Sequence, residues 1–169
     1  MARHKNKNYG QGFTLIELLV VIAIISLLAS IALIAFQSAQ AKARNVRRLG
    51  DMTQMDTALE LYFNTYKGYP SSTNGQPLPL TKDFAITIPH APTPADGVCD
   101  GMVHSSDVTV NNSSIPVDAN TYYYIAEGAG YTGAYGVTVY PSYTYYFCLG
   151  DVTGGFSAGE HSLTAVGIR

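Results

Sequence analysis

The chain has 169 residues, of which 47% are hydrophobic and 13% charged, with a formal net charge of -2 at pH 7. This length predicts one domain with at most an appendage, and the hydrophobic content excludes disorder of the whole chain. From Gly68 onward only Lys82 and Arg169 oppose eight acidic residues. Because phosphate binding needs clustered lysine and arginine, this acidic part argues against a nucleic-acid-binding surface.

The N-terminal part is a basic leader followed by a long apolar run. Residues 1–12 contain Arg3, Lys5 and Lys7 and no acidic residue, whereas residues 13–36 are almost entirely apolar. Residues 18–36 carry no charge, and as a helix they would extend roughly 28 Å. Because a bilayer's hydrocarbon core is about 30 Å thick, the run predicts a single membrane-spanning helix.

A cleaved secretory signal is the alternative interpretation of this segment, but the apolar run is too long for one. No small-residue cleavage site follows it, and residues 37–48 continue in strong helix formers. The apolar segment is therefore expected to stay in the protein. Three basic residues precede it and four follow it, so flanking charge does not fix its orientation.

The junction Gly12-Phe13-Thr14-Leu15-Ile16-Glu17 resembles the type IV prepilin signature. That superfamily includes type IV pilins and the pseudopilins of type II secretion. The resemblance implies a leader at residues 1–12, cleavage by a prepilin peptidase after Gly12, and methylation of the new N-terminal residue, Phe13. It also implies a role in assembly for Glu17.

Physical chemistry also supports a functional role for Glu17, independently of the resemblance. An ionisable side chain within a lipid-spanning run costs on the order of 3 kcal/mol unless it is paired or neutralised, so it marks a functional site by default. The plainer alternative is a carboxylate near the interface that reaches toward water.

Two positions depart from the family pattern. Many relatives have glycine where this chain has Ser26 and proline where it has Ile34, and those residues are associated with local melting of the helix on assembly. Serine and isoleucine neither relax the backbone nor remove a hydrogen-bond donor. We therefore expect an unbroken helix here.

After the membrane segment the helix becomes amphipathic over residues 37–67. One apolar face follows at spacings of three and four: Val46, Leu49, Met52, Met55, Leu59, Tyr62 and Tyr66. Lys67 then supplies a cation in the last turn, Gly68 a C-cap and Pro70 a stop, so the helix is predicted to end at about Lys67. The apolar face is expected to pack on the chain's own sheet.

The remainder, residues 68–169, is predicted to be a globular antiparallel sheet domain with a loop at residues 71–120. Short runs rich in Tyr, Thr, Val and Ile predict strands at residues 121–126, 136–140, 142–149 and 161–168. The fold class is therefore α+β: a long N-terminal helix packed on a small C-terminal antiparallel sheet, as in pilins.

Cys99 and Cys148 are the only cysteines, and in an exported domain two cysteines favour one disulfide. A metal pair would need further ligands, and His90, His104 and His161 form no such pattern. Major pseudopilins often bind calcium in this region; the scattered acids permit calcium here, but no loop motif specifies it. No cofactor is predicted.

One catalytic motif is matched, because residues 155–159 read G-x-S-x-G with His161 close by. The nucleophile elbow needs a strand, a sharp turn and a following helix within a large parallel sheet, with the triad acid and histidine well downstream. Only ten residues follow Gly159, so we expect a glycine-rich turn between the last two strands. The sequons at Asn111 and Asn112 indicate an exposed loop at best.

The resemblance thus predicts a structural subunit of a type IV filament, not an enzyme. It implies a homopolymer of identical or related subunits, with a prepilin peptidase, an assembly ATPase and a platform protein as partners. The subunit would cross the cytoplasmic membrane once before assembly and lie in an extracellular or envelope filament afterwards. Two alternatives stay open: a pseudopilin of a type II secretion pseudopilus and, from another class, an N-terminally membrane-anchored surface binding module.

Overall fold

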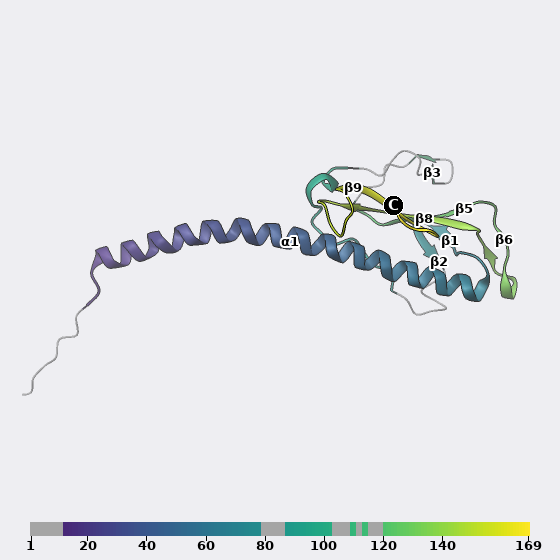
Figure 1. Cartoon of the computed structure of the whole chain (residues 1–169), viewed down its shortest axis with the longest axis horizontal. Coiled ribbons are helices and arrows are strands. Elements are labelled where there is room, and N and C mark those ends of the chain that lie inside the picture. Colours follow the sequence, from purple (N-terminus) through teal and green to yellow (C-terminus); the bar gives the residue numbers. More distant parts are fainter. Residues whose placement is uncertain (1–11, 79–86, 103–108, 111–112, 115–119) are drawn as a thin grey trace, which may run out of the picture. The chain divides into compact units, whose positions relative to one another are not determined.

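The computed structural model describes residues 12–78, 87–102, 109–110, 113–114 and 120–169. The chain divides into two units, Met1–Ala39 and Gln40–Arg169. Helix α1, Leu15–Tyr66, contributes to both, and a sheet with three small hairpins belongs to the second unit (Figure 1). The predicted α+β class is confirmed.

The first half of α1 is helical without interruption. Ser26 and Ser30 sit in its apolar stretch, and their hydroxyls donate to the carbonyls of Ile22 at 2.7 Å and Ser26 at 2.9 Å. Each hydroxyl is thus satisfied within the helix and needs no outside partner. The helix passes through Ile34 with no break.

The C-terminal end of α1 differs from the predicted one. Lys67, not Gly68, adopts the left-handed conformation, with φ 64°, and its N–H donates to the Phe63 carbonyl at 2.7 Å. This is a single-bond left-handed cap. Gly68 is required for another reason: a Cβ there would collide with the side chains of Val139 and Tyr131.

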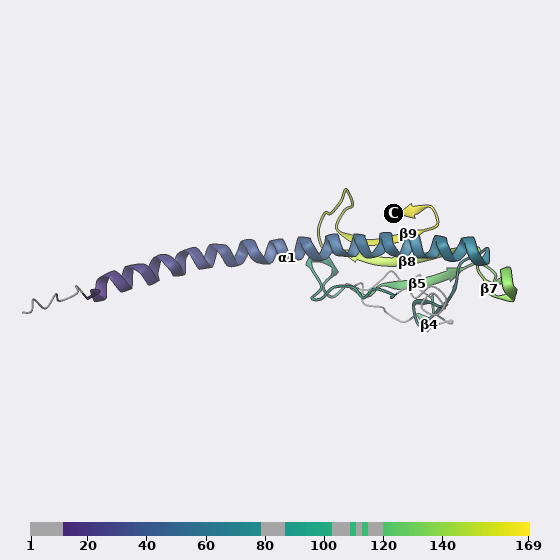
Figure 2. The ribbon, with the colours of Figure 1, turned by 90° about the horizontal axis from the view of Figure 1, so that it is seen from below.

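Behind the second half of α1 lies a four-stranded antiparallel sheet in the order β10-β9-β8-β5 (Figure 2). Its strands are β5 (Tyr123–Glu127), β8 (Ser142–Leu149), β9 (Gly159–Thr164) and β10 (Gly167–Ile168). The predicted strand 142–149 is β8 with the same bounds. The predicted single strand 161–168 is wrong, because the chain turns at Ala165 and Val166 to form β9 and β10.

The two faces of β8 have different tasks because side chains alternate along a strand. Tyr143, Tyr145, Phe147 and Leu149 all face the core with α1. Cys148 points to the opposite face, where it packs in a separate small cluster.

The core is built largely from tyrosine rings, and two of the hydroxyls find partners at its edge. The Tyr124 hydroxyl donates to the Pro70 carbonyl at 2.9 Å, and the Tyr122 hydroxyl donates to Asp51 at 2.9 Å. Burial raises the pKa of both phenols. The rings therefore fill the core without leaving these polar groups unsatisfied.

The apolar face predicted for α1 is correct except at its start. Met52, Met55, Leu59 and Tyr62 are buried, and Leu49 and Tyr66 pack against them. Val46, however, is 61% exposed. Asn45 and Arg48 are buried at that level instead. Arg48 donates to the Pro92 carbonyl, and the Gly150 N–H donates to the Asn45 side-chain oxygen.

The predicted loop at residues 71–120 is wrong in its first part. Strands β1 (Ser71–Thr73) and β2 (Gln76–Leu78) form a hairpin around Asn74 and Gly75, which have φ of 50° and 72°. An Asn-Gly pair suits a two-residue hairpin turn, in which both residues need positive φ. Further along lie the short helix η1 (Gly97–Cys99) and the paired strands β3 (Thr109–Val110) and β4 (Ser113–Ser114).

One more hairpin, not predicted as such, joins β5 to β8. It comprises β6 (Tyr131–Thr132), the short helix η2 (Ala134–Gly136) and β7 (Thr138–Val139). Tyr69 pairs with Tyr140 directly after β7, exchanging backbone hydrogen bonds of 2.8 and 2.9 Å. The end of α1 is thereby fixed to this hairpin.

Candidate processing and assembly site

The proposed cleavage junction is open. Phe13 is 86% exposed, and a Cβ added to Gly12 would meet no atom within 4 Å. Both residues precede the first turn of α1, where the backbone is not helical. The rest of the leader, residues 1–11, lies outside the described residues. The junction therefore offers an exposed, non-helical peptide bond.

Glu17 closes a capping box with Thr14 at the start of α1. The Thr14 backbone N–H and hydroxyl both donate to Glu17 Oε2, at 2.9 and 2.7 Å. The Glu17 N–H in turn points to the Thr14 hydroxyl oxygen at 3.3 Å. This reciprocal pattern satisfies backbone donors that the first turn of a helix otherwise leaves without partners. It also explains why the helix begins at Leu15 and not at Phe13.

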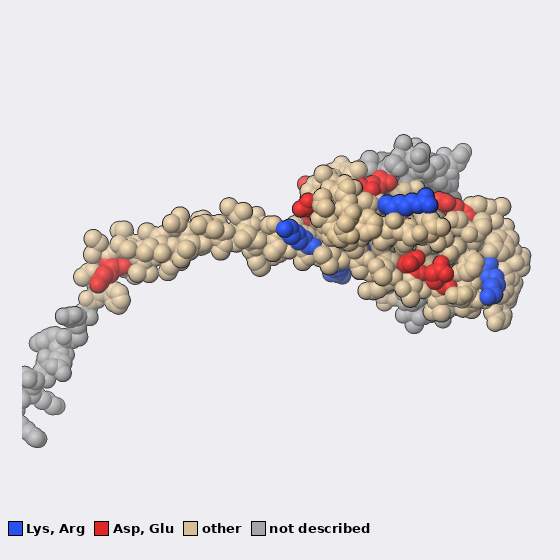
Figure 3. All heavy atoms as spheres, viewed as in Figure 1, with Lys and Arg blue, Asp and Glu red and all other residues tan. Residues whose placement is uncertain are grey.

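The apolar stretch of α1 is exposed along its whole length. Its hydropathy and length qualify it as a candidate membrane span, and none of that window is buried. Figure 3 shows one acidic patch at its N-terminal end and otherwise uncharged side chains. Glu17 is the only acidic residue between residues 13 and 36. This stretch therefore has to be covered by lipid or by other protein.

In the second unit, a cluster of ion pairs fastens α1 to the segment before η1. Arg44 binds Asp96 through two nitrogens, at 2.8 and 2.5 Å, and buried Arg48 reaches the same carboxylate at 3.2 Å. Arg48 also donates to the Pro92 carbonyl and to Asn120. The hydrogen-bonded Arg44 guanidinium lowers the pKa of the Asp96 carboxyl. Asp96 is thus held as an anion between two cations.

A disulfide holds the same segment on its other side. Cys99, in η1, is joined to Cys148, on the outer face of β8, with a Cα–Cα distance of 5.9 Å. Between the two attachments, Gly97 and Gly150 approach so closely that a Cβ on either would strike the opposite backbone. Ion pairs and disulfide together fix this segment to both α1 and the sheet.

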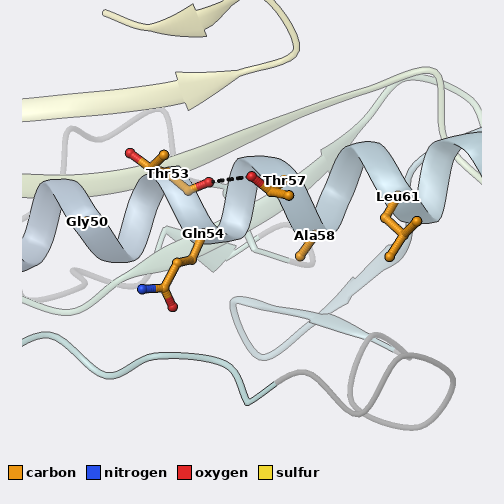
Figure 4. Close-up of a pocket in the computed structure, with 6 residues that line it drawn as sticks. All are labelled: Gly50, Thr53, Gln54, Thr57, Ala58 and Leu61. Carbon is orange, nitrogen blue, oxygen red and sulfur yellow. Dashed lines mark hydrogen bonds between the residues drawn. The ribbon is translucent and has the colours of Figure 1, made fainter.

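A hollow of about 640 Å³ lies along the second half of α1 (Figure 4). Its lining consists of Gly50, Thr53, Gln54, Thr57, Ala58 and Leu61. The Thr53 hydroxyl donates to the Leu49 carbonyl and the Thr57 hydroxyl to the Thr53 carbonyl. Both hydroxyl protons are therefore used in bonds within the helix. The lining of this hollow is therefore mostly apolar although it contains two threonines.

The G-x-S-x-G segment at residues 155–159 is a turn between β8 and β9, as predicted. Strand β9 begins at Gly159, where a nucleophile elbow would need a helix. The two ring nitrogens of His161 lie 2.9 and 2.8 Å from the carbonyl oxygens of Arg169 and Ser157. The histidine is thus engaged by backbone. Within the described residues no three His, Cys, Asp or Glu side chains gather as a metal site. His104 and the asparagines of both sequons lie outside the described residues.

Fold and N-terminus together define a class of protein: one with an exposed, non-helical start, an exposed apolar helix segment and a small antiparallel sheet domain. Residues 7–33 match the family model described as the prokaryotic N-terminal methylation motif. That motif is the signature of type IV pilin and pseudopilin precursors, and it indicates a structural subunit rather than an enzyme. No curated protein and no solved structure matched the chain.

Two features of the site were missing from the sequence interpretation. Thr14 has a local signal, since Thr-x-x-Glu before an apolar run is the pattern of a capping box. The pairing of Arg44 and Arg48 with Asp96 has none, because about fifty residues separate the partners.

Proposed function

We propose that the chain is a subunit of a type IV pilus. It is cut between Gly12 and Phe13, anchored in the cytoplasmic membrane by residues 13–36, and polymerised with that helix in the filament core and its sheet domain outside. The observation that carries the proposal is the methylation motif on a helix whose apolar side chains between residues 13 and 36 are all exposed. Lipid covers them before assembly, and neighbouring subunits cover them afterwards.

The proposal assigns each partner a task. A prepilin peptidase removes the leader and methylates Phe13; an assembly ATPase and a membrane platform protein drive polymerisation. Identical or related subunits then supply the remaining contacts. The hollow along Gly50, Thr53 and Thr57 is a candidate contact face, because a small or inward-bonded side chain lets another helix approach.

Electron microscopy of filaments sheared from the native host tests this function. We expect thin filaments that contain the chain, and none from a Gly12→Arg variant, whose basic side chain would block cleavage. A Lys67→Gln variant, altered at the far end of α1, is the matched control and should assemble normally. Filaments built from uncleaved Gly12→Arg subunits would contradict the proposal.

The same experiment separates the alternatives. A pseudopilin would give no surface filaments at native expression, and its deletion would abolish secretion of folded proteins. An anchored binding module would keep residues 1–12 and would not polymerise at all.

A further inference from the structure

His161 lies in β9, and its side chain is only 8% exposed. Its Nδ1 lies 2.9 Å from the carbonyl oxygen of Arg169, which directly follows β10. Its Nε2 lies 2.8 Å from the carbonyl oxygen of Ser157, in the turn that precedes β9. The imidazole ring is therefore a bridge between the two segments that come before and after β9 in the chain.

The two carbonyl oxygens determine how many protons the ring has to carry. A carbonyl oxygen only accepts hydrogen bonds, whereas a neutral imidazole has one N–H donor and one acceptor nitrogen. A neutral His161 would bond one carbonyl and leave the lone pair of its other nitrogen against an oxygen, with no proton between them. The doubly protonated imidazolium has a donor for each carbonyl, and its charge strengthens both bonds.

Two phenylalanine rings flank His161. The centroid of its ring lies 5.6 Å from that of Phe147, its register partner on β8, and 5.5 Å from that of Phe156, in the turn. An aromatic ring attracts a cation that lies within about 6 Å of its centroid. The two rings therefore restrict the access of water to the imidazole and are compatible with its charged form.

The ionisable side chains around His161 are engaged elsewhere or lie on another face. The surrounding elements carry these groups at its end of the sheet: Arg48 and Asp51 on α1, Asp96 and Asp100 beside η1, Tyr145 on β8, Glu160 on β9 and Arg169 after β10. Arg48 is bound to Asp96, and Asp51 accepts a bond from Tyr122. Strand alternation places Glu160 on the opposite face of β9. Among the residues that the structure describes, no carboxylate forms an ion pair with His161.

We propose that His161 is a pH-sensitive clasp that ties the turn before β9 to the C-terminal strand β10. The doubly protonated ring holds both carbonyls. As pH rises and the ring loses one proton, it holds either carbonyl but not both, so the stabilisation is present in acid and lost toward alkaline pH. Strand β10 has two residues and lies at the edge of the sheet (Figure 2), so it is the segment that loosens. This inference does not rest on the proposed function.

Amide hydrogen exchange of the full-length protein in micelles, followed by NMR, tests the clasp. The Arg169 N–H, which donates to the Ser162 carbonyl at 2.8 Å, reports on β10, and the ring nitrogen shifts of His161 report its protonation. Protection of this amide, corrected for the intrinsic pH dependence of exchange, should fall about tenfold between about pH 5 and about pH 8. Histidine ordinarily changes charge over this interval, and a bond to a charged group contributes about that factor. The fall should follow the loss of the ring proton.

Two glutamine variants form a matched pair for this experiment. His161→Gln has no charge to lose, so its Arg169 amide should be weakly protected at both pH values. His90→Gln alters an exposed histidine and should keep the wild-type response. Asp96 does not interfere, because the Arg44 guanidinium lowers the pKa of its carboxyl and it stays an anion over this interval.

Three results would overturn the proposal. The first is an unchanged protection of the Arg169 amide in wild type while His161 loses a proton; this measurement needs no variant and holds even where His161→Gln does not fold. The second is a wild-type ring with a single N–H at about pH 5. The third is a full pH response in His161→Gln. None of these results bears on filament formation, so the proposed function is tested separately.

Discussion

Thr14 and Glu17 are each other's partners: the Thr14 hydroxyl donates to the Glu17 carboxylate at 2.7 Å and lies 3.3 Å from the Glu17 N–H. The one carboxylate of the apolar stretch is therefore already engaged in the single chain. For Glu17 to bind the free amine of Phe13 in an adjacent subunit after cleavage, it has to share or exchange this local bond. The observed capping and the proposed assembly role of Glu17 can therefore be tested separately.

Comparison of Thr14→Ala with Glu17→Ala separates these tasks. Thr14→Ala removes the cap and should cost about 1 kcal/mol of helix stability, while the carboxylate remains available to a neighbour's amine. Glu17→Ala removes both, so filament number, counted by electron microscopy, should fall sharply with cleavage and insertion intact. Equal filament numbers in the two variants would assign Glu17 to capping alone.

Cleavage between Gly12 and Phe13 is expected because the junction is exposed and not helical. Intact-mass measurement on protein from its own membrane should show the loss of twelve residues and the addition of one methyl group. A mature species that retains residues 1–12 would refute the processing step.

The Cys99–Cys148 bond should stabilise the sheet domain strongly. It closes a loop with a sequence separation of 49, and the chain-entropy model gives roughly 4 kcal/mol for a loop of this length. Non-reducing peptide maps of native protein should show the linked peptides, and the double Cys→Ser variant should unfold at much lower urea. Free thiols in native protein would contradict this prediction.

Acid should weaken the second unit through Asp96. Hydrogen bonding to the Arg44 guanidinium keeps the pKa of Asp96 below its ordinary value of 3.8 in the folded protein. Its stabilisation is therefore fully present above that value and is lost as pH falls through the lower, folded pKa. Urea unfolding of the full-length protein in micelles should show this loss below about pH 4. Asp96→Asn should be less stable at pH 7 and lack this part of the acid response; an unchanged acid response in the variant would show that other groups cause it.

The helix between Ser26 and Ile34 should stay intact in the assembled filament. Both serine hydroxyls in this stretch bond to helix carbonyls, and neither Ser26 nor Ile34 weakens the backbone as glycine and proline do. A filament map that shows this stretch extended would mean that subunit packing, rather than sequence, drives melting.

The parts of the fold that the sequence predicted best are those with local signals. The apolar run identifies the exposed half of α1, and a run of aromatic and β-branched residues identifies β8 to the residue. The β1–β2 hairpin also had a local signal, Asn74-Gly75, but its strands are too short to show alternation. No local sequence signal predicted that Arg48 is buried while Val46 is exposed. Burial of a polar side chain is favourable there only because Asp96 and Pro92, from a distant segment of the chain, hydrogen-bond to it.

The exposure of the apolar stretch also limits the route by which a subunit enters a filament. Sixteen large apolar side chains between Phe13 and Phe36 are at least 46% exposed. Moving them all into water would cost on the order of 30 kcal/mol, at roughly 2 kcal/mol for each side chain. This cost excludes an intermediate in which the apolar helix of a free subunit lies in water. In the proposed filament, each subunit therefore exchanges lipid for protein neighbours at the membrane itself.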